Sequence, residues 1–234
     1  MTTARKSNPL IDLLVSIIIP SIVLMKFSGE ADLGPAGALI VALAFPIGWG
    51  MYELIRFQVK NCIAVLGLVS VLLTGGIGLL QLDAQWLAVK EAAIPGIIGL
   101  VVVGSAQIGK PLVRTMLFNP LVLDTEKITS ILREREQESV FESHLVNATY
   151  MLGGTFFFSS LMNYLLATWI VTSPSGSPAF NEELGRLTLL SYPVIAIPSM
   201  LMMFGIFYFL WRVIHRLTGL SLEEMLAASA KEEK

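Results

Sequence analysis

Long apolar stretches separated by short polar connections limit the fold of this 234-residue chain more than any other feature. Hydrophobic residues make up 54% of it and charged residues only 15%, whereas about a quarter of a soluble domain is charged. A helix of about 20 apolar residues crosses the bilayer core. We therefore predict an all-α, polytopic membrane protein, a six-helix transmembrane bundle with spans at residues 9–27, 35–56, 62–82, 86–109, 145–171 and 187–214.

The Lys and Arg residues indicate the orientation of these spans. With six spans, all 16 of them except Lys26, Lys90 and Arg186 fall on one side of the membrane. The positive-inside rule makes that side cytoplasmic, so both termini are expected in the cytoplasm. Removing any one span would place basic clusters on both sides, so the charge pattern favours six spans.

Two short helices are predicted on the cytoplasmic side. Residues 124–144 are charged and carry Ile128, Ile131 and Leu132 on one helical face. The second helix covers residues 221–232. We expect these helices and the spans to form one integral membrane domain, residues 1–234.

Sequence signals also predict how the last span and the last helix are joined. Gly219 is a suitable C-cap for the last span. Ser221 and Glu224 have the spacing of a capping box, in which each side chain bonds the other residue's backbone N–H. The final helix should therefore begin directly after the last span.

Charged side chains at bilayer depth are costly and therefore suggest binding sites. Asp12 lies about one turn into the first span, and Glu53 and Arg56 lie at a similar depth in the second. One hypothesis is a substrate- or ion-binding site, in which Asp12 or Glu53 binds a proton or cation and Asn163 contacts the substrate. The alternative is structural, with ion pairs fixing two helices and Asn163 hydrogen-bonding a neighbouring helix.

Lys110 and Arg114 lie one turn apart just after the fourth span. Two basic side chains at the level of the headgroups are suited to bind the phosphate of an anionic lipid. The alternative is that they only anchor the cytoplasmic end of the span.

Small residues within the spans, and charged residues at their outer ends, suggest contacts between helices. Ser70, Thr74 and Gly78 form a small-residue ridge in the third span. The ridge suits packing within the bundle, and it is also compatible with a homodimer. Lys26 is expected either to pair with Glu91 or to extend its ammonium group to the membrane surface. Further small residues lie in the fourth and fifth spans, at Gly96, Gly99 and Gly153.

Signals of enzymatic chemistry are missing from the sequence. Cys62 is the single cysteine, which excludes an intrachain disulfide and a multi-cysteine metal site. His144 and His215 lack the motif of attached haem, and there is no phosphate-binding loop or nucleophile elbow. We predict no catalytic residues, no metal, no cofactor and, without a dense basic run, no nucleic-acid partner.

Several short motifs carry a family resemblance over about residues 94–172. They are Lys110-Pro-Leu-Val-Arg-Thr-Met-Leu117, Leu145-Val-Asn147, Phe156-Phe-Phe158 and Asn163-Tyr-Leu-Leu-Ala167. Together they resemble the intracellular septation protein A family. The chain differs from that family in its charged segment 124–142, in His144 where tryptophan is usual, and in six spans rather than five.

The resemblance implies a bacterial inner-membrane protein linked to cell division and envelope maintenance, without an assigned enzymatic activity. The first functional hypothesis is therefore a non-enzymatic membrane protein whose partners are membrane lipids and other envelope or division proteins. The alternative is a small secondary transporter or lipid-handling protein with a polar site that faces the cytoplasm.

Overall fold

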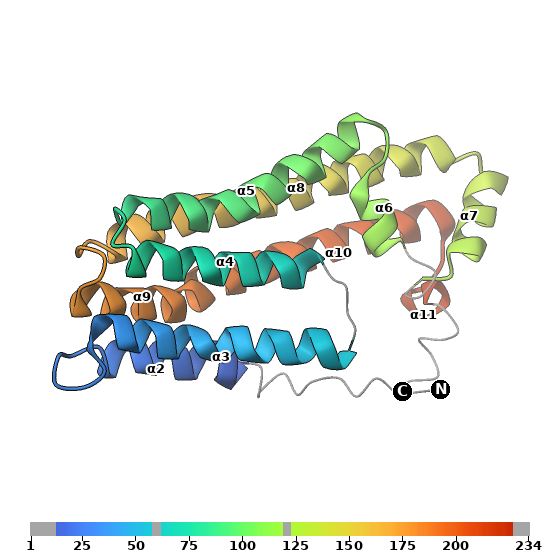
Figure 1. Ribbon diagram of the computed structural model, residues 1–234. Helices are drawn as coiled ribbons and strands as arrows, with labels where there is room; N and C mark the ends of the chain where they lie inside the picture. The colour runs from blue at the N-terminus through green and yellow to red at the C-terminus, as the bar shows by residue number, and fades with distance from the viewer. Residues whose placement is uncertain (1–12, 58–61, 119–122, 227–234) are drawn as a thin grey trace. The chain divides into compact units, whose positions relative to one another are not determined.

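The computed structural model describes residues 13–57, 62–118 and 123–226 (Figure 1). These residues form helices joined by short connections, with an isolated β-bridge between Leu123 and Leu226, so the predicted all-α class is confirmed. The helices are η1 (Leu14–Ile18), α2 (Ile19–Lys26), α3 (Gly34–Phe57), α4 (Cys62–Leu79), α5 (Gln85–Gln107), α6 (Leu112–Leu117), α7 (Thr125–Glu134), α8 (Glu138–Ile170), α9 (Pro178–Ser191), η2 (Tyr192–Ala196), α10 (Ile197–Thr218) and α11 (Leu222–Met225).

The chain divides into two compact units. Unit 1 comprises Met1–Ala93 and Leu161–Ile195, and unit 2 comprises Ile94–Ser160 and Ala196–Lys234. Each unit has its own hydrophobic core. Helices α5 and α8 each contribute residues to both units.

Unit 1 packs α2 against α3 and α9, and α3 against α4 (Figure 1). Its core includes the fully buried side chains of Leu39, Leu87 and Phe180. The buried Asn181 of α9 donates from Nδ2 to Ser28 Oγ at 3.0 Å and to the Pro35 carbonyl at 2.8 Å. These two hydrogen bonds fix α9 to the connection after α2 and to the first turn of α3.

Two π-helical stretches, η1 and η2, each come just before an Ile-Pro-Ser sequence. These sequences begin at Ile19 and at Ile197. Proline lacks an amide hydrogen and its ring meets the carbonyl four residues earlier, and a wider turn relieves that mismatch. Helices α9, η2 and α10 therefore follow one another without a loop from Pro178 to Thr218. The sequence predicts that the last span begins at residue 187, but the continuous helical segment already begins at Pro178.

Unit 2 brings α5 and α8 together at glycines. A Cβ atom built on Gly96 would lie 3.1 Å from Ser160 Oγ, and one on Gly99 would lie 3.2 Å from Phe156 Cβ. At Gly153 of α8 the Cβ would come within 2.5 Å of Val103 Cγ2. The small residues that the sequence placed in these two helices are therefore the points of closest approach.

The charged segment 124–144 is divided in the structure. Helix α7 ends at Glu134, and α8 begins at Glu138 and continues for 33 residues. Between them Glu136 takes a left-handed conformation with φ of 55°, and the Gln137 amide donates to the Leu132 carbonyl at 2.8 Å. This is the pattern that commonly ends a helix, although glycine usually occupies the left-handed position.

Three short helices, α6, α7 and α11, pack against the first turns of α8 and the last turns of α10 in unit 2. We call these three helices the cap. Ile128 and Leu132 of α7 are buried in the core of unit 2, as their common helical face predicts. Met225 of α11 is buried with them, and its carbonyl accepts from the Asp124 amide at 2.8 Å. The predicted capping box of Ser221 and Glu224 is confirmed.

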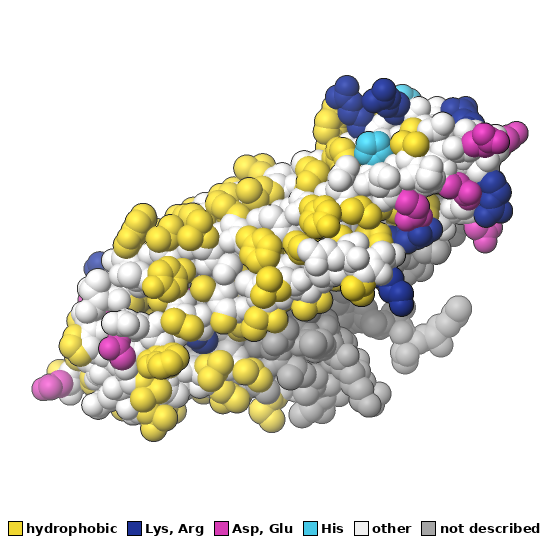
Figure 2. All heavy atoms as spheres, turned by 90° about the horizontal axis from the view of Figure 1, so that it is seen from above, with side chains coloured by type: hydrophobic (Ala, Val, Ile, Leu, Met, Phe, Trp, Pro, Cys, Tyr) yellow, Lys and Arg dark blue, Asp and Glu magenta, His cyan; other side chains and the backbone are white. Residues whose placement is uncertain are grey.

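Among the described residues, three helical segments are long and apolar enough to cross a membrane: Gly34–Tyr52, Gln85–Gln107 and Pro178–Thr218. Many of their large apolar side chains are exposed, for example Leu100 at 64% and Leu201 at 62%. Figure 2 shows one face on which hydrophobic side chains are spread widely, while in unit 2 the charged side chains gather at the end that carries the cap. Such extensive apolar exposure is typical of a lipid-facing surface.

Candidate functional site

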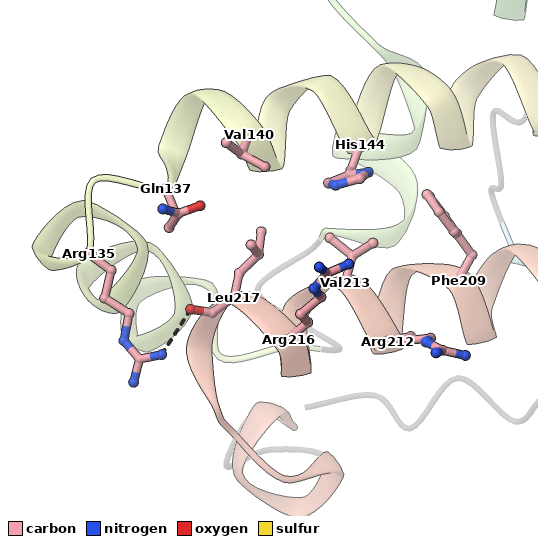
Figure 3. A pocket seen from close by; sticks show the side chains of 9 residues that line it. All are labelled: Arg135, Gln137, Val140, His144, Phe209, Arg212, Val213, Arg216 and Leu217. Carbon is pink, nitrogen blue, oxygen red and sulfur yellow. Dashed lines mark hydrogen bonds between the residues drawn. The ribbon is translucent and has the colours of Figure 1, made fainter.

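A cavity of about 720 Å³ opens between the first turns of α8 and the last turns of α10, within unit 2 (Figure 3). Four of its lining side chains, three guanidinium groups and one imidazole, can donate hydrogen bonds. The lining residues are Arg135, Gln137, Val140, His144, Phe209, Arg212, Val213, Arg216 and Leu217. None of these described lining residues is acidic, so the cavity carries a concentrated positive charge.

Arg212 and Arg216 provide most of this charge. They lie four residues apart on α10 and are both exposed. Neither forms a hydrogen bond or an ion pair with any residue in the described ranges. Like charges at this spacing repel each other along a helix, so the pair is suited to an anion that both guanidinium groups can contact.

Arg135 and His144 complete the polar part of the wall. Arg135 donates to the Leu217 carbonyl at 3.1 Å, which leaves its other N–H groups available. The ring of His144 meets Phe209 edge-on, with ring centroids 5.8 Å apart. Its buried Nδ1 atom has no hydrogen-bond partner within the part of the chain that the structure describes. In Figure 3, His144 from α8 and Arg216 from α10 point into the space between these helices.

Apolar side chains form the remainder of the cavity wall. They are Val140 on α8, and Phe209, Val213 and Leu217 on α10. A volume of this size is typical of sites for small molecules. The combination of guanidinium groups with an apolar wall suits a ligand that has an anionic head and an apolar part.

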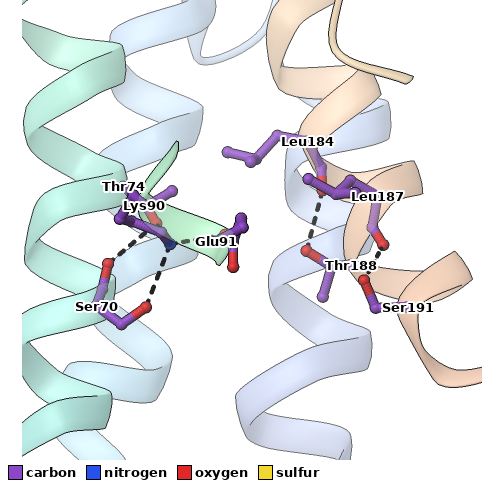
Figure 4. A network of polar contacts seen from close by, with 8 residues as sticks. All are labelled: Ser70, Thr74, Lys90, Glu91, Leu184, Leu187, Thr188 and Ser191. Carbon is purple, nitrogen blue, oxygen red and sulfur yellow. Dashed lines mark hydrogen bonds and ion pairs between the residues drawn. The ribbon is translucent and has the colours of Figure 1, made fainter. Parts of the chain in front are cut away.

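A second polar cluster lies in unit 1, around the buried Lys90 of α5 (Figure 4). The Lys90 ammonium donates to Thr74 Oγ1 at 2.7 Å and to Ser70 Oγ at 3.2 Å, and lies 2.6 Å from Glu91 Oε1. Thr74 Oγ1 in turn donates to the Ser70 carbonyl at 3.0 Å. All three ammonium hydrogens can thus be satisfied.

This cluster answers an open question about Lys26. Glu91 pairs with Lys90, while Lys26 is exposed and forms no ion pair with a described residue. The ridge of Ser70 and Thr74, expected to support helix packing, also holds the lysine. Because its charge is compensated and its hydrogen bonds are made, the Lys90 cluster is suited to joining α4 with α5.

The other residues singled out in the sequence fall in different places. Asp12 and the side chains of Glu53 and Arg56 lie outside the described part of the structure, so that cluster stays a prediction. Asn163 is half-buried on α8, in unit 1.

The predicted lipid-binding pair, Lys110 and Arg114, is exposed in unit 2. Arg114 forms an ion pair of 2.5 Å with Glu142 of α8, so part of its charge is already compensated. Lys110 follows Gly109, whose positive φ of 72° turns the chain after α5. A role of this pair in lipid binding stays a prediction.

The sequence alone does not identify the residues of the cationic cavity as a site. It indicates Arg212 and Arg216 only as cytoplasmic charges, although their four-residue spacing beside aromatic residues is a usable signal. Nothing in the sequence places His144, on a distant helix, beside them. Within the described ranges, no three His, Cys, Asp or Glu side chains gather closely enough to hold a metal ion.

Comparisons with known proteins add no further assignment. No protein-family model, curated protein or solved structure matches this chain. The candidate sites therefore rest on their own chemistry.

Proposed function

We propose that this chain is a multi-pass protein of the bacterial inner membrane, with six spans and both termini in the cytoplasm. Three long apolar helices support the membrane location. The orientation is supported by the Lys and Arg residues, of which all but Lys26, Lys90 and Arg186 fall on one side of the six-span arrangement. The cap then lies on the cytoplasmic surface.

Cysteine labelling in intact cells tests this topology. Cys62 is first replaced by serine, and single cysteines are then introduced at the exposed positions Ser130 of α7 and Ala179 of α9. A membrane-impermeant maleimide is expected to label A179C in intact cells and S130C only after permeabilisation. The opposite pattern would overturn the orientation.

We further infer that the protein is non-enzymatic and acts in cell-envelope maintenance or division. The observation that carries this inference is the cap, a folded surface whose helices are anchored to the ends of α8 and α10 by buried side chains. The resemblance of residues 94–172 to the septation protein A family supports the same role. In this proposal, the cap is the part that other envelope or division proteins contact.

A buried aspartate in the cap is expected to abolish function in vivo. Ile128 is fully buried, and an unpaired carboxylate there costs several kcal/mol. In a strain that lacks the gene, the wild-type chain should restore normal envelope integrity and cell division, whereas I128D should not. S130D, an exposed change on the same helix, is the matched control, and immunoblots of the membrane fraction establish that each variant is present.

Rescue of the deletion strain by I128D as complete as by S130D would contradict a role for the cap. Absence of any envelope or division defect in the deletion strain would contradict the proposed function itself.

The cationic cavity favours a second candidate function, lipid handling. The transporter hypothesis has no comparable support. It depends on four residues, Asp12, Glu53, Arg56 and Asn163, and the structure describes the side chain of Asn163 alone among them.

A further inference from the structure

We propose that the cavity between α8 and α10 is a binding site for an anionic phosphate group. Three arginines and a histidine line it, and no described lining residue is acidic. Guanidinium groups donate paired hydrogen bonds to phosphate oxygens. The site differs from Lys110 and Arg114, the pair that the sequence suggests for lipid.

The two guanidinium groups of α10 are available for this contact. Arg212 and Arg216 make no hydrogen bond or ion pair with the residues that the structure describes. They lie four residues apart on the same side of α10, and no described residue compensates their charge. In Figure 3 the Arg216 side chain points toward α8, whereas that of Arg212 extends along α10. Both side chains are exposed, and a phosphate toward which both turn would form charge-assisted hydrogen bonds with them.

His144 adds an imidazole to the polar part of this site. Its Nδ1 atom is buried and lacks a hydrogen-bond partner among described residues, although buried polar atoms are usually paired. The ring lines the same cavity as both arginines. Because Nδ1 is enclosed by protein atoms, Nε2 is the ring nitrogen that can donate to a phosphate oxygen in the cavity when it carries the hydrogen.

The apolar part of the wall indicates that a phospholipid is the favoured source of the phosphate. Val140, Phe209, Val213 and Leu217 line the cavity beside the charged groups, and free phosphate would leave them uncovered. In the proposed topology, the cavity lies at the cytoplasmic headgroup level, where basic pockets between helices bind anionic lipids. Only this placement depends on the proposed topology, because the binding chemistry depends on the cavity itself.

Binding can be measured on the purified full-length protein in a neutral detergent. The probes are dioctanoyl phosphatidylglycerol, dioctanoyl phosphatidylcholine and inorganic phosphate, and the readouts are native mass spectrometry and the lipid-induced change in melting temperature. We expect phosphatidylglycerol to bind more tightly than phosphatidylcholine, which has the same acyl chains but no net charge. R212Q/R216Q is expected to weaken phosphatidylglycerol binding about tenfold or more.

Matched variants separate the cavity from other basic surfaces. R133Q removes an exposed arginine of α7 that does not line the cavity, and it should bind like the wild type. R212K/R216K keeps the charge but loses the paired geometry, so it should bind with intermediate affinity. Without lipid, R212Q/R216Q should melt at the same temperature as the wild type or higher, because it removes a repulsion. A purely structural role of these arginines would instead lower the melting temperature.

Competition with inorganic phosphate identifies the source of the ligand. Failure of millimolar phosphate to displace phosphatidylglycerol assigns the site to lipid. Displacement that depends on Arg212 and Arg216 assigns it to a soluble phosphate compound instead. The proposal is overturned if R212Q/R216Q binds phosphatidylglycerol like the wild type, or if K110Q/R114Q alone abolishes binding. These results are obtained in detergent, so they are independent of the division phenotype and of the membrane orientation.

Discussion

Replacing Lys90 with methionine is expected to lower the free energy of unfolding by about 3 kcal/mol. The substitution leaves Glu91 without the ammonium that lies 2.6 Å from its carboxylate. Ser70 and Thr74 lose their donor at the same time. Removing the buried ammonium is costly because the Glu91 carboxylate, 28% exposed, is left only partly hydrated and without its partner. The measurement is denaturant or thermal unfolding in detergent, followed by circular dichroism.

Two further variants make this test specific. K26M removes an exposed lysine of α2 and should change the unfolding free energy little, since surface substitutions are usually within about 0.5 kcal/mol. The double variant K90M/E91Q removes both charges and should recover most of the lost stability. If K90M is no less stable than K26M, the Lys90 cluster does not hold α4 and α5 together.

Replacing Gly153 with alanine is expected to destabilise unit 2 by about 1–3 kcal/mol, the usual cost of overpacking. The new methyl group would lie 2.5 Å from Val103 Cγ2. Valine has one strongly preferred rotamer in a helix and cannot easily turn away. Helices α5 and α8 must therefore separate or shift. The melting temperature in detergent should fall accordingly.

The neighbouring glycine is an almost ideal control for this change. Gly154 lies on the same helix and is exposed, and a methyl group added there would meet no atom within 4 Å. G154A should thus leave stability unchanged or raise it slightly through helix propensity. Equal melting temperatures for G153A and G154A would contradict the close approach of α5 and α8 at Gly153.

Local patterns in the sequence predicted the parts of the fold that depend on neighbouring residues. The buried face of α7, with Ile128 and Leu132, follows from helical periodicity. The left-handed Gly219 after α10 and the capping box at Ser221 follow from known helix-end preferences. The glycines of α5 and α8 indicated where helices approach each other, although not which helices would meet.

Features that depend on distant residues could not be predicted in this way. The break between α7 and α8 has neither glycine nor proline, because Glu136 takes the left-handed position itself. The sequence suggested Lys26 as a possible partner of Glu91, whereas the neighbouring Lys90 forms that ion pair. The cationic cavity brings together His144 and Arg216, which belong to separate helices, so its existence follows from tertiary packing.

The length of helix α8 determines how the cap is connected to the membrane in the proposed topology. Its 33 residues extend for about 50 Å, whereas the hydrocarbon core is about 30 Å thick. In the proposed topology its first turns therefore stand clear of the lipid tails as an unbroken continuation of the span. His144 lies in this extension, and Gly153 lies further along the same helix, inside the predicted span 145–171. In the proposed topology, a continuous helix rather than a flexible loop therefore joins the cap to the bilayer.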